Sequence, residues 1–108
     1  MRACTLAELP EDEGLRLSTV PVTSVFATES GIFCIDDTCT HDTSSLADGW
    51  IEGCVVECVL HMARFDLRTG DVVSPPARRP VSTHPVACVD GVVLVALPAA
   101  YLVKEQSP

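Results

Sequence analysis

Basic residues are few in this sequence. Lysine and arginine total 7 of 108 residues, against 15 aspartates and glutamates, so the formal net charge is −8. An acidic surface repels the phosphate backbone of nucleic acids, so nucleic-acid binding is not expected. The same surface favours encounters with basic patches on other proteins.

Long hydrophobic runs are absent as well. The longest apolar stretch, Val92 to Ala100, is too short to cross a bilayer and contains Pro98. The first nine residues have one basic residue and no apolar run of signal-peptide length. We therefore expect no membrane association and a cytoplasmic location. In a reducing cytosol the six cysteines favour metal binding over a disulfide framework.

Aromatic residues are scarce, at 5%, whereas valine is abundant, which favours strands over helices. Residues 20–27 and 32–35 are β-rich and predict a hairpin. Residues 86–89 and 92–95 flank Asp90-Gly91, the pair favoured by a two-residue type I′ hairpin. The length and pattern predict one small all-β domain over residues 1–108.

Two segments do not fit the strand pattern. Residues 36–50 are rich in Asp, Thr and Ser and have no apolar period, so they need another source of order than a hydrophobic face. Residues 74–80 contain three prolines and predict neither a helix nor a central strand. The sequence thus indicates a polar insertion in a small β domain.

Four residues with metal-ligand chemistry form two pairs, Cys39 with His41 and Cys58 with His61. Residues i and i+2 of an extended chain point to the same side, so Cys39 and His41 can face one target. The three-residue step from Cys58 to His61 has the same effect around a tight turn. Two adjoining loops would then offer two sulfurs and two nitrogens.

Two metal centres accept this ligand set. A tetrahedral zinc binds two Cys and two His, but its usual spacing groups the cysteines together and the histidines together. Here the order alternates, which is poor for a zinc finger. A Rieske 2Fe-2S centre binds one iron through two Cys and the other through two His, and each loop then supplies one ligand to each iron.

The ligand pairs lie within a longer pattern. Its segments are Ile35-Asp36-Asp37, Cys39-Thr40-His41, Leu46-Ala47-Asp48-Gly49, Val56-Glu57-Cys58, Leu60-His61, Arg64-Phe65-Asp66, Pro75-Pro76-Ala77 and Val89-Asp90-Gly91-Val92. Together they resemble the small Rieske ferredoxins of bacterial aromatic-ring dioxygenase systems, of the biphenyl and carbazole type, and the resemblance covers essentially the whole chain. Two positions depart from the family pattern: Val59, where proline is common, and Met62, near which many members have glycine.

The resemblance implies the all-β Rieske fold, a small antiparallel sandwich or barrel base with an inserted two-loop cluster-binding part. The base would comprise residues 1–37 and 67–108, and the inserted part residues 38–66 or thereabouts.

The resemblance also implies one Rieske 2Fe-2S cluster. Its metal ligands would be Cys39, His41, Cys58 and His61, with the edges of His41 and His61 forming the electron-transfer surface. Three further residues would surround the cluster: Ala63, Phe65 and Pro76.

The function implied is that of an electron carrier and not of an enzyme. The carrier would take electrons from a flavin (FAD) ferredoxin reductase and pass them to a terminal oxygenase, shuttling as a monomer. Two alternatives remain open at this point, the small Rieske-like subunit of an assimilatory nitrite reductase and a zinc-stabilised interaction module.

Rieske proteins of respiratory complexes have a disulfide at the positions of Ser44 and Leu60, which cannot form here. They also have hydroxyl donors to the cluster sulfurs where this chain has Ala63 and Phe65. Such donors stabilise the reduced cluster, so their loss predicts a low redox potential.

The remaining cysteines and histidine have simpler interpretations. Cys4, Cys34, Cys54 and Cys88 are predicted to be packing or incidental thiols. His84, which precedes a proline at a strand start, is predicted to be an ordinary surface residue. Trp50 is predicted to lie in the core or over the cluster loop, with partner contact as the less favoured interpretation.

Overall fold

The structure is a computed structural model that describes all residues except 12, 41–43, 60–62, 76–78 and 102–108. The described elements are β1 (Arg2–Thr5), η1 (Leu6–Glu8), β2 (Gly14–Leu17), β3 (Thr23–Thr28), β4 (Gly31–Asp36), η2 (Leu46–Asp48), β5 (Trp50–Glu52), β6 (Val55–Glu57), β7 (Arg64–Asp66), β8 (Val72–Ser74), β9 (Thr83–His84), β10 (Val86–Val89) and β11 (Val92–Val95). The two η elements are short 3-10 turns. Among the described residues no helix is long or apolar enough to span a membrane.

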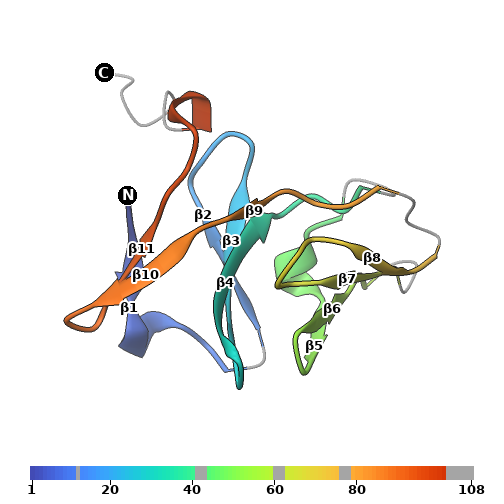
Figure 1. Ribbon diagram of the computed structural model, residues 1–108, viewed down its shortest axis with the longest axis horizontal. Helices are drawn as coiled ribbons and strands as arrows, with labels where there is room; N and C mark the ends of the chain where they lie inside the picture. Colours follow the sequence, from blue (N-terminus) through green and yellow to red (C-terminus); the bar gives the residue numbers. More distant parts are fainter. Residues whose placement is uncertain (12, 41–43, 60–62, 76–78, 102–108) are drawn as a thin grey trace.

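Three antiparallel sheets lie side by side across the molecule (Figure 1). The first has the strand order β1-β11-β10, the second β2-β3-β4-β9 and the third β5-β6-β7-β8. The expected all-β fold with antiparallel sheets is therefore confirmed. The first two sheets form a sandwich, and the third packs against the opposite face of the second.

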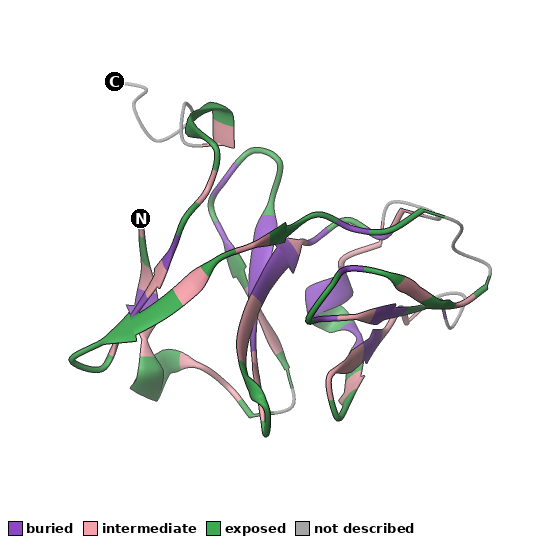
Figure 2. Ribbon diagram, in the orientation of Figure 1, coloured by how far each residue is buried: buried purple, intermediate pink, exposed green. Residues whose placement is uncertain are grey.

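The central strands β3 and β4 of the second sheet carry buried residues (Figure 2). Successive side chains of a strand point to opposite sides, so these two strands contribute to the cores on both faces of the sheet. Val25 of β3 and Cys34 of β4 pack toward the first sheet, whereas Phe26 and Ile35 pack toward the third. The residues between the second and third sheets, called the site core below, are Phe26, Ile35, Cys39, Leu46, Val56, Cys58, Ala63, Phe65, Leu67 and Val81. The two predicted cysteine ligands thus belong to a hydrophobic core.

Both predicted hairpins are present. β10 and β11 have the predicted bounds, and Asp90 and Gly91 have φ of 50° and 77°, as a type I′ turn requires. In the other hairpin β3 begins at Thr23, three residues later than predicted, because the chain first passes through the loop that contains Pro21.

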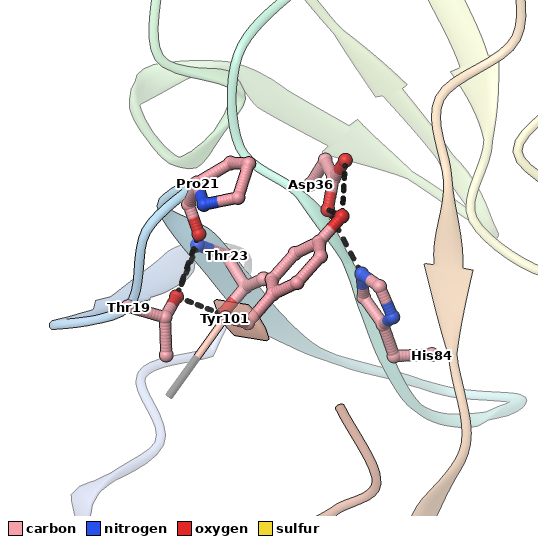
Figure 3. Close-up of polar contacts among 6 residues, drawn as sticks. All are labelled: Thr19, Pro21, Thr23, Asp36, His84 and Tyr101. Atoms are coloured by element: carbon pink, nitrogen blue, oxygen red, sulfur yellow. Dashed lines mark hydrogen bonds and ion pairs between the residues drawn. The ribbon is translucent and has the colours of Figure 1, made fainter. Parts of the chain in front are cut away.

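His84 is not the surface residue that we predicted. Its side chain is only 6% exposed, and its Nε2 lies 2.8 Å from Oδ1 of Asp36. The Tyr101 hydroxyl donates to the same carboxylate at 3.0 and 3.1 Å (Figure 3). Burial, reinforced by the bond to Asp36, raises the pKa of Tyr101. These contacts join β9 and the C-terminal segment to the end of β4.

The four cysteines predicted as packing or incidental thiols divide into two groups. Cys4 and Cys34 are buried, as expected of packing residues, and burial raises the pKa of Cys34 to about 12. Cys54 is half-buried and Cys88 is exposed, so the packing interpretation does not hold for Cys88. Its position on the outer strand of the first sheet explains its exposure.

Candidate metal centre

The first ligand loop is closed by a ladder of hydrogen bonds that begins where β4 ends. The backbone N–H of Leu46 donates to the Asp37 carbonyl at 2.7 Å, and that of Ala47 donates to the Asp37 carboxylate at 2.9 Å. One step further along, the Cys39 N–H donates to the Ser44 carbonyl at 2.9 Å. The polar segment that lacks a hydrophobic period is therefore ordered by a buried aspartate.

The second ligand loop is the tip of the β6–β7 hairpin. The Cys58 N–H donates to the Ala63 carbonyl at 2.8 Å, which brings the two ends of this loop together. Cys58 and Ala63 are both fully buried. This closure sets the cysteine at the point where the strand enters the loop.

The two loops lie against each other. The Cys58 thiol donates to Oγ of Ser44 at 3.4 Å, and Cys39 and Cys58 are 1% and 0% exposed within the same core. From the sequence, Ser44 is notable only as a position where respiratory Rieske proteins have a disulfide. No sequence signal indicates its contact with Cys58, because the two residues are joined only when the loops meet.

Gly49 allows this close approach. A Cβ built on Gly49 would lie 2.2 Å from the backbone oxygen of Glu57, the residue before Cys58. Its backbone has φ of −81°, which any residue adopts, so the requirement for glycine is a matter of space alone. The end of the first loop thus packs directly on the strand that leads into the second.

A third loop adjoins the first. The Thr40 hydroxyl donates to the Arg79 carbonyl at 2.6 Å, which ties the first ligand loop to the proline-containing segment. Pro76 itself lies outside the described residues, as do His41 and His61. Among the described residues the structure therefore brings together Cys39, Cys58 and their surroundings, and the two histidine ligands stay predictions.

The described residues fit an iron–sulfur cluster. Two thiols lie buried at the ends of adjoining loops, and cysteine sulfur is the ligand that such clusters require. Ala63 and Phe65, both 0% exposed, line the site core beside Cys58 without offering a hydroxyl. The surroundings are hydrophobic, which limits access of water to a bound cluster.

Comparison with known families decides between the two centres that the sequence left open. Residues 1–85 match the family described as the Rieske [2Fe-2S] domain. The chain belongs to the Rieske family. It accordingly carries a Rieske 2Fe-2S cluster, which replaces the zinc interpretation.

Two proteins similar to this Rieske protein are ferredoxins. It is 40% identical over 99 residues to the 3-phenylpropionate/cinnamic acid dioxygenase ferredoxin subunit of Shigella flexneri serotype 5b, covering 91% of this chain and 93% of that one. The Sphingomonas yanoikuyae B1 ferredoxin superposes with a TM-score of 0.84 at 31% identity, covering 91% of this chain and 98% of that one.

A third comparison concerns a complex. A chain from the complex of reduced oxygenase and oxidised ferredoxin in carbazole 1,9a-dioxygenase matches with a TM-score of 0.83 at 28% identity, covering 89% of this chain and all (100%) of that one. This protein is therefore a Rieske ferredoxin of the aromatic dioxygenase type, an electron carrier and not a catalytic enzyme.

Proposed function

We propose that this ferredoxin carries one electron at a time from an FAD-containing ferredoxin reductase to the terminal oxygenase of an aromatic-ring dioxygenase system. The observation that carries the proposal is the pair of buried thiols on adjoining loops in a chain of the Rieske family. The reductase is inferred from the chemistry. A carrier that accepts one electron at a time needs a donor that divides the two electrons of a hydride, as a flavin does. We further propose that the ferredoxin is a monomer in the cytoplasm, where Cys4, Cys34, Cys54 and Cys88 remain thiols.

We propose that Cys39 and Cys58 ligate one iron and that His41 and His61 ligate the other. When bound, the cluster takes up and releases one electron without forming a new bond to the protein. Residues 38–66 or thereabouts would make up the cluster-binding part, and residues 1–37 and 67–108 the base. The remaining ring nitrogens of the two histidines would face the electron partners.

The role of the surrounding residues is to hold the ligands still and to keep water out. The Asp37 and Cys39 hydrogen bonds fix the first loop, and the Cys58–Ala63 bond fixes the second. Phe65 packs below them in the site core. A rigid ligand set lowers the rearrangement that accompanies electron transfer, because the same geometry serves both oxidation states.

The redox potential is expected to be low for a Rieske centre, on the order of −150 mV. Ala63 and Phe65 offer no O–H to the cluster sulfurs, so the more negative reduced state has fewer donors to stabilise it. The variants Ala63→Ser and Phe65→Tyr should each raise the potential in a redox titration followed by visible absorption. A wild-type potential well above zero would contradict this assignment.

Reconstitution tests the proposed function directly. Purified ferredoxin is combined with an FAD reductase, an aromatic-ring oxygenase and NADH, and product formation is measured. We expect turnover to depend on the ferredoxin and to saturate as its concentration rises. Reduction of the ferredoxin by the reductase without any transfer to an oxygenase would refute the proposal.

A further inference from the structure

The third sheet has two different faces. Its inward row crosses all four strands through Ile51, Val56, Phe65 and Val72, which pair in register and pack on the site core. The outward face carries the alternate residues of the same strands. This outward face is where a large apolar side chain remains in solvent.

Trp50 lies on that outward face and is 59% exposed, more than any other large hydrophobic residue described. The predicted core position is therefore wrong, and cover of the cluster loop stays a prediction. Burial of a tryptophan side chain in a partner contributes a large favourable binding free energy, while only two side-chain torsions lose their freedom. Exposed tryptophans are therefore frequent anchors of interfaces.

Val73 lies on β8, at the opposite edge of the third sheet from the Trp50 strand β5, and is 52% exposed. The pairing of β7 with β8 shifts register between Arg64 and Phe65, which gives β8 one extra residue, Val73. Such bulges redirect a side chain relative to a regular strand. Here the redirected side chain lines a groove of about 430 Å³ that also includes Trp50, Val55, Glu57 and Arg64.

The groove adjoins the proposed cluster site. Trp50 pairs with Glu57, and Glu57 pairs with Arg64 across the next strand. Glu57 directly precedes Cys58, and Arg64 directly follows Ala63, the two residues that close the second ligand loop. A protein seated in the groove is thus placed next to that loop, where an electron partner has to bind.

The charge around the groove selects the kind of partner. In the groove, Nε of Arg64 lies 2.8 Å from Oε1 of Glu57. Glu52 is exposed at the margin of the groove. The chain as a whole has a net charge of −8. A complementary segment therefore combines an apolar side chain for the groove with a basic side chain, which can also lie over the Trp50 ring.

We propose that this groove is a docking surface for the terminal oxygenase, which inserts an apolar side chain between Trp50 and Val73 and places a basic side chain beside Glu52. The inference rests on the proposed function and adds to it a specific contact surface. The reductase is the alternative occupant, and the test separates the two.

The first test measures binding without turnover. Trp50 is the only tryptophan of the chain, so incorporation of 5-fluorotryptophan into the cluster-loaded ferredoxin yields a single ¹⁹F resonance. We expect this resonance to shift or broaden on addition of the oxygenase that accepts electrons from the wild type, and to be unaffected by the reductase. A resonance that responds to the reductase alone would assign the groove to the reductase and overturn the proposal.

The second test uses a matched set of variants. Trp50→Ala should raise the ferredoxin concentration for half-maximal oxygenase turnover by about tenfold or more, and Val73→Ser should raise it by a smaller factor. Val89→Ser is the control, because Val89 is 53% exposed but lies on β10 of the first sheet. Visible spectra and redox potentials should remain those of the wild type in all three variants.

Two outcomes would overturn the proposal: unchanged half-saturation by oxygenase in both groove variants, or an equal effect of Val89→Ser. Failure of the proposed function has a different signature, since the wild type would then support no oxygenase turnover at all. If Trp50→Ala alters folding, Val73→Ser and the ¹⁹F titration still decide the question.

Discussion

Replacement of His41 or His61 by alanine is expected to abolish the visible absorption of the purified ferredoxin and to reduce its iron content from two atoms per chain to nearly none. Each histidine is proposed to be one of only two protein ligands of its iron. An alanine offers no donor atom, so that iron would keep only one protein ligand. Absorption spectra and iron and acid-labile sulfide analyses measure the loss.

The chain contains its own control for this experiment. His84 is the third and last histidine of the sequence, and its Nε2 contacts Asp36 on the second sheet. His84→Ala removes the same side chain from a place that we do not assign to the cluster, so its spectrum and iron content should remain those of the wild type. Retention of the Rieske spectrum by both the His41 and the His61 variants would refute the ligand assignment.

Gly49→Ala is expected to destabilise the loaded protein by about 2–3 kcal/mol, as overpacking against a fixed neighbour does. For a domain of this size the melting temperature should then fall by about 10 °C or more. The new methyl group would meet the Glu57 carbonyl oxygen at 2.2 Å, and neither atom can rotate away, because the Cβ is fixed to its backbone and the oxygen is a backbone atom. Relief requires the first ligand loop to move away from β6, and hence away from Cys58.

Gly53→Ala is the matched control for that substitution. Gly53 has φ of 61°, and a Cβ there meets nothing within 4 Å. Alanine at this position should therefore destabilise the protein only through its left-handed backbone conformation, by about 1 kcal/mol. Thermal unfolding and iron content together distinguish the two variants. We expect reduced cluster loading for Gly49→Ala alone. Equal unfolding temperatures and equal loading would show that the approach of the two loops is unimportant.

Local patterns were sufficient for a large part of this fold. The β10–β11 hairpin was predicted with its bounds, because the two-residue turn depends only on Asp90 and Gly91 and their immediate neighbours. The alternating Cys–His spacing indicated the kind of centre, since it reflects which iron each loop can reach. The family match agrees with that interpretation, although His41, His61 and Pro76 lie outside the described residues.

Other features depend on pairs of residues that are distant in the chain. The burial of His84 follows from its contact with Asp36, 48 residues away, and the burial of Cys39 and Cys58 in one core follows from the packing of the third sheet on the second. A residue's own neighbours in sequence do not specify such contacts.

Trp50 also shows the difference between what local sequence predicts and what tertiary contacts decide. Its size and hydrophobicity predict a buried position, but the pairing of β5 with β6 turns it to the outward face, while Ile51 packs inward. Residue types and short spacings could be read along the chain, because strand alternation, turn chemistry and ligand preference act over a few residues. Which face is covered, and which loops meet, was decided only when the sheets packed together.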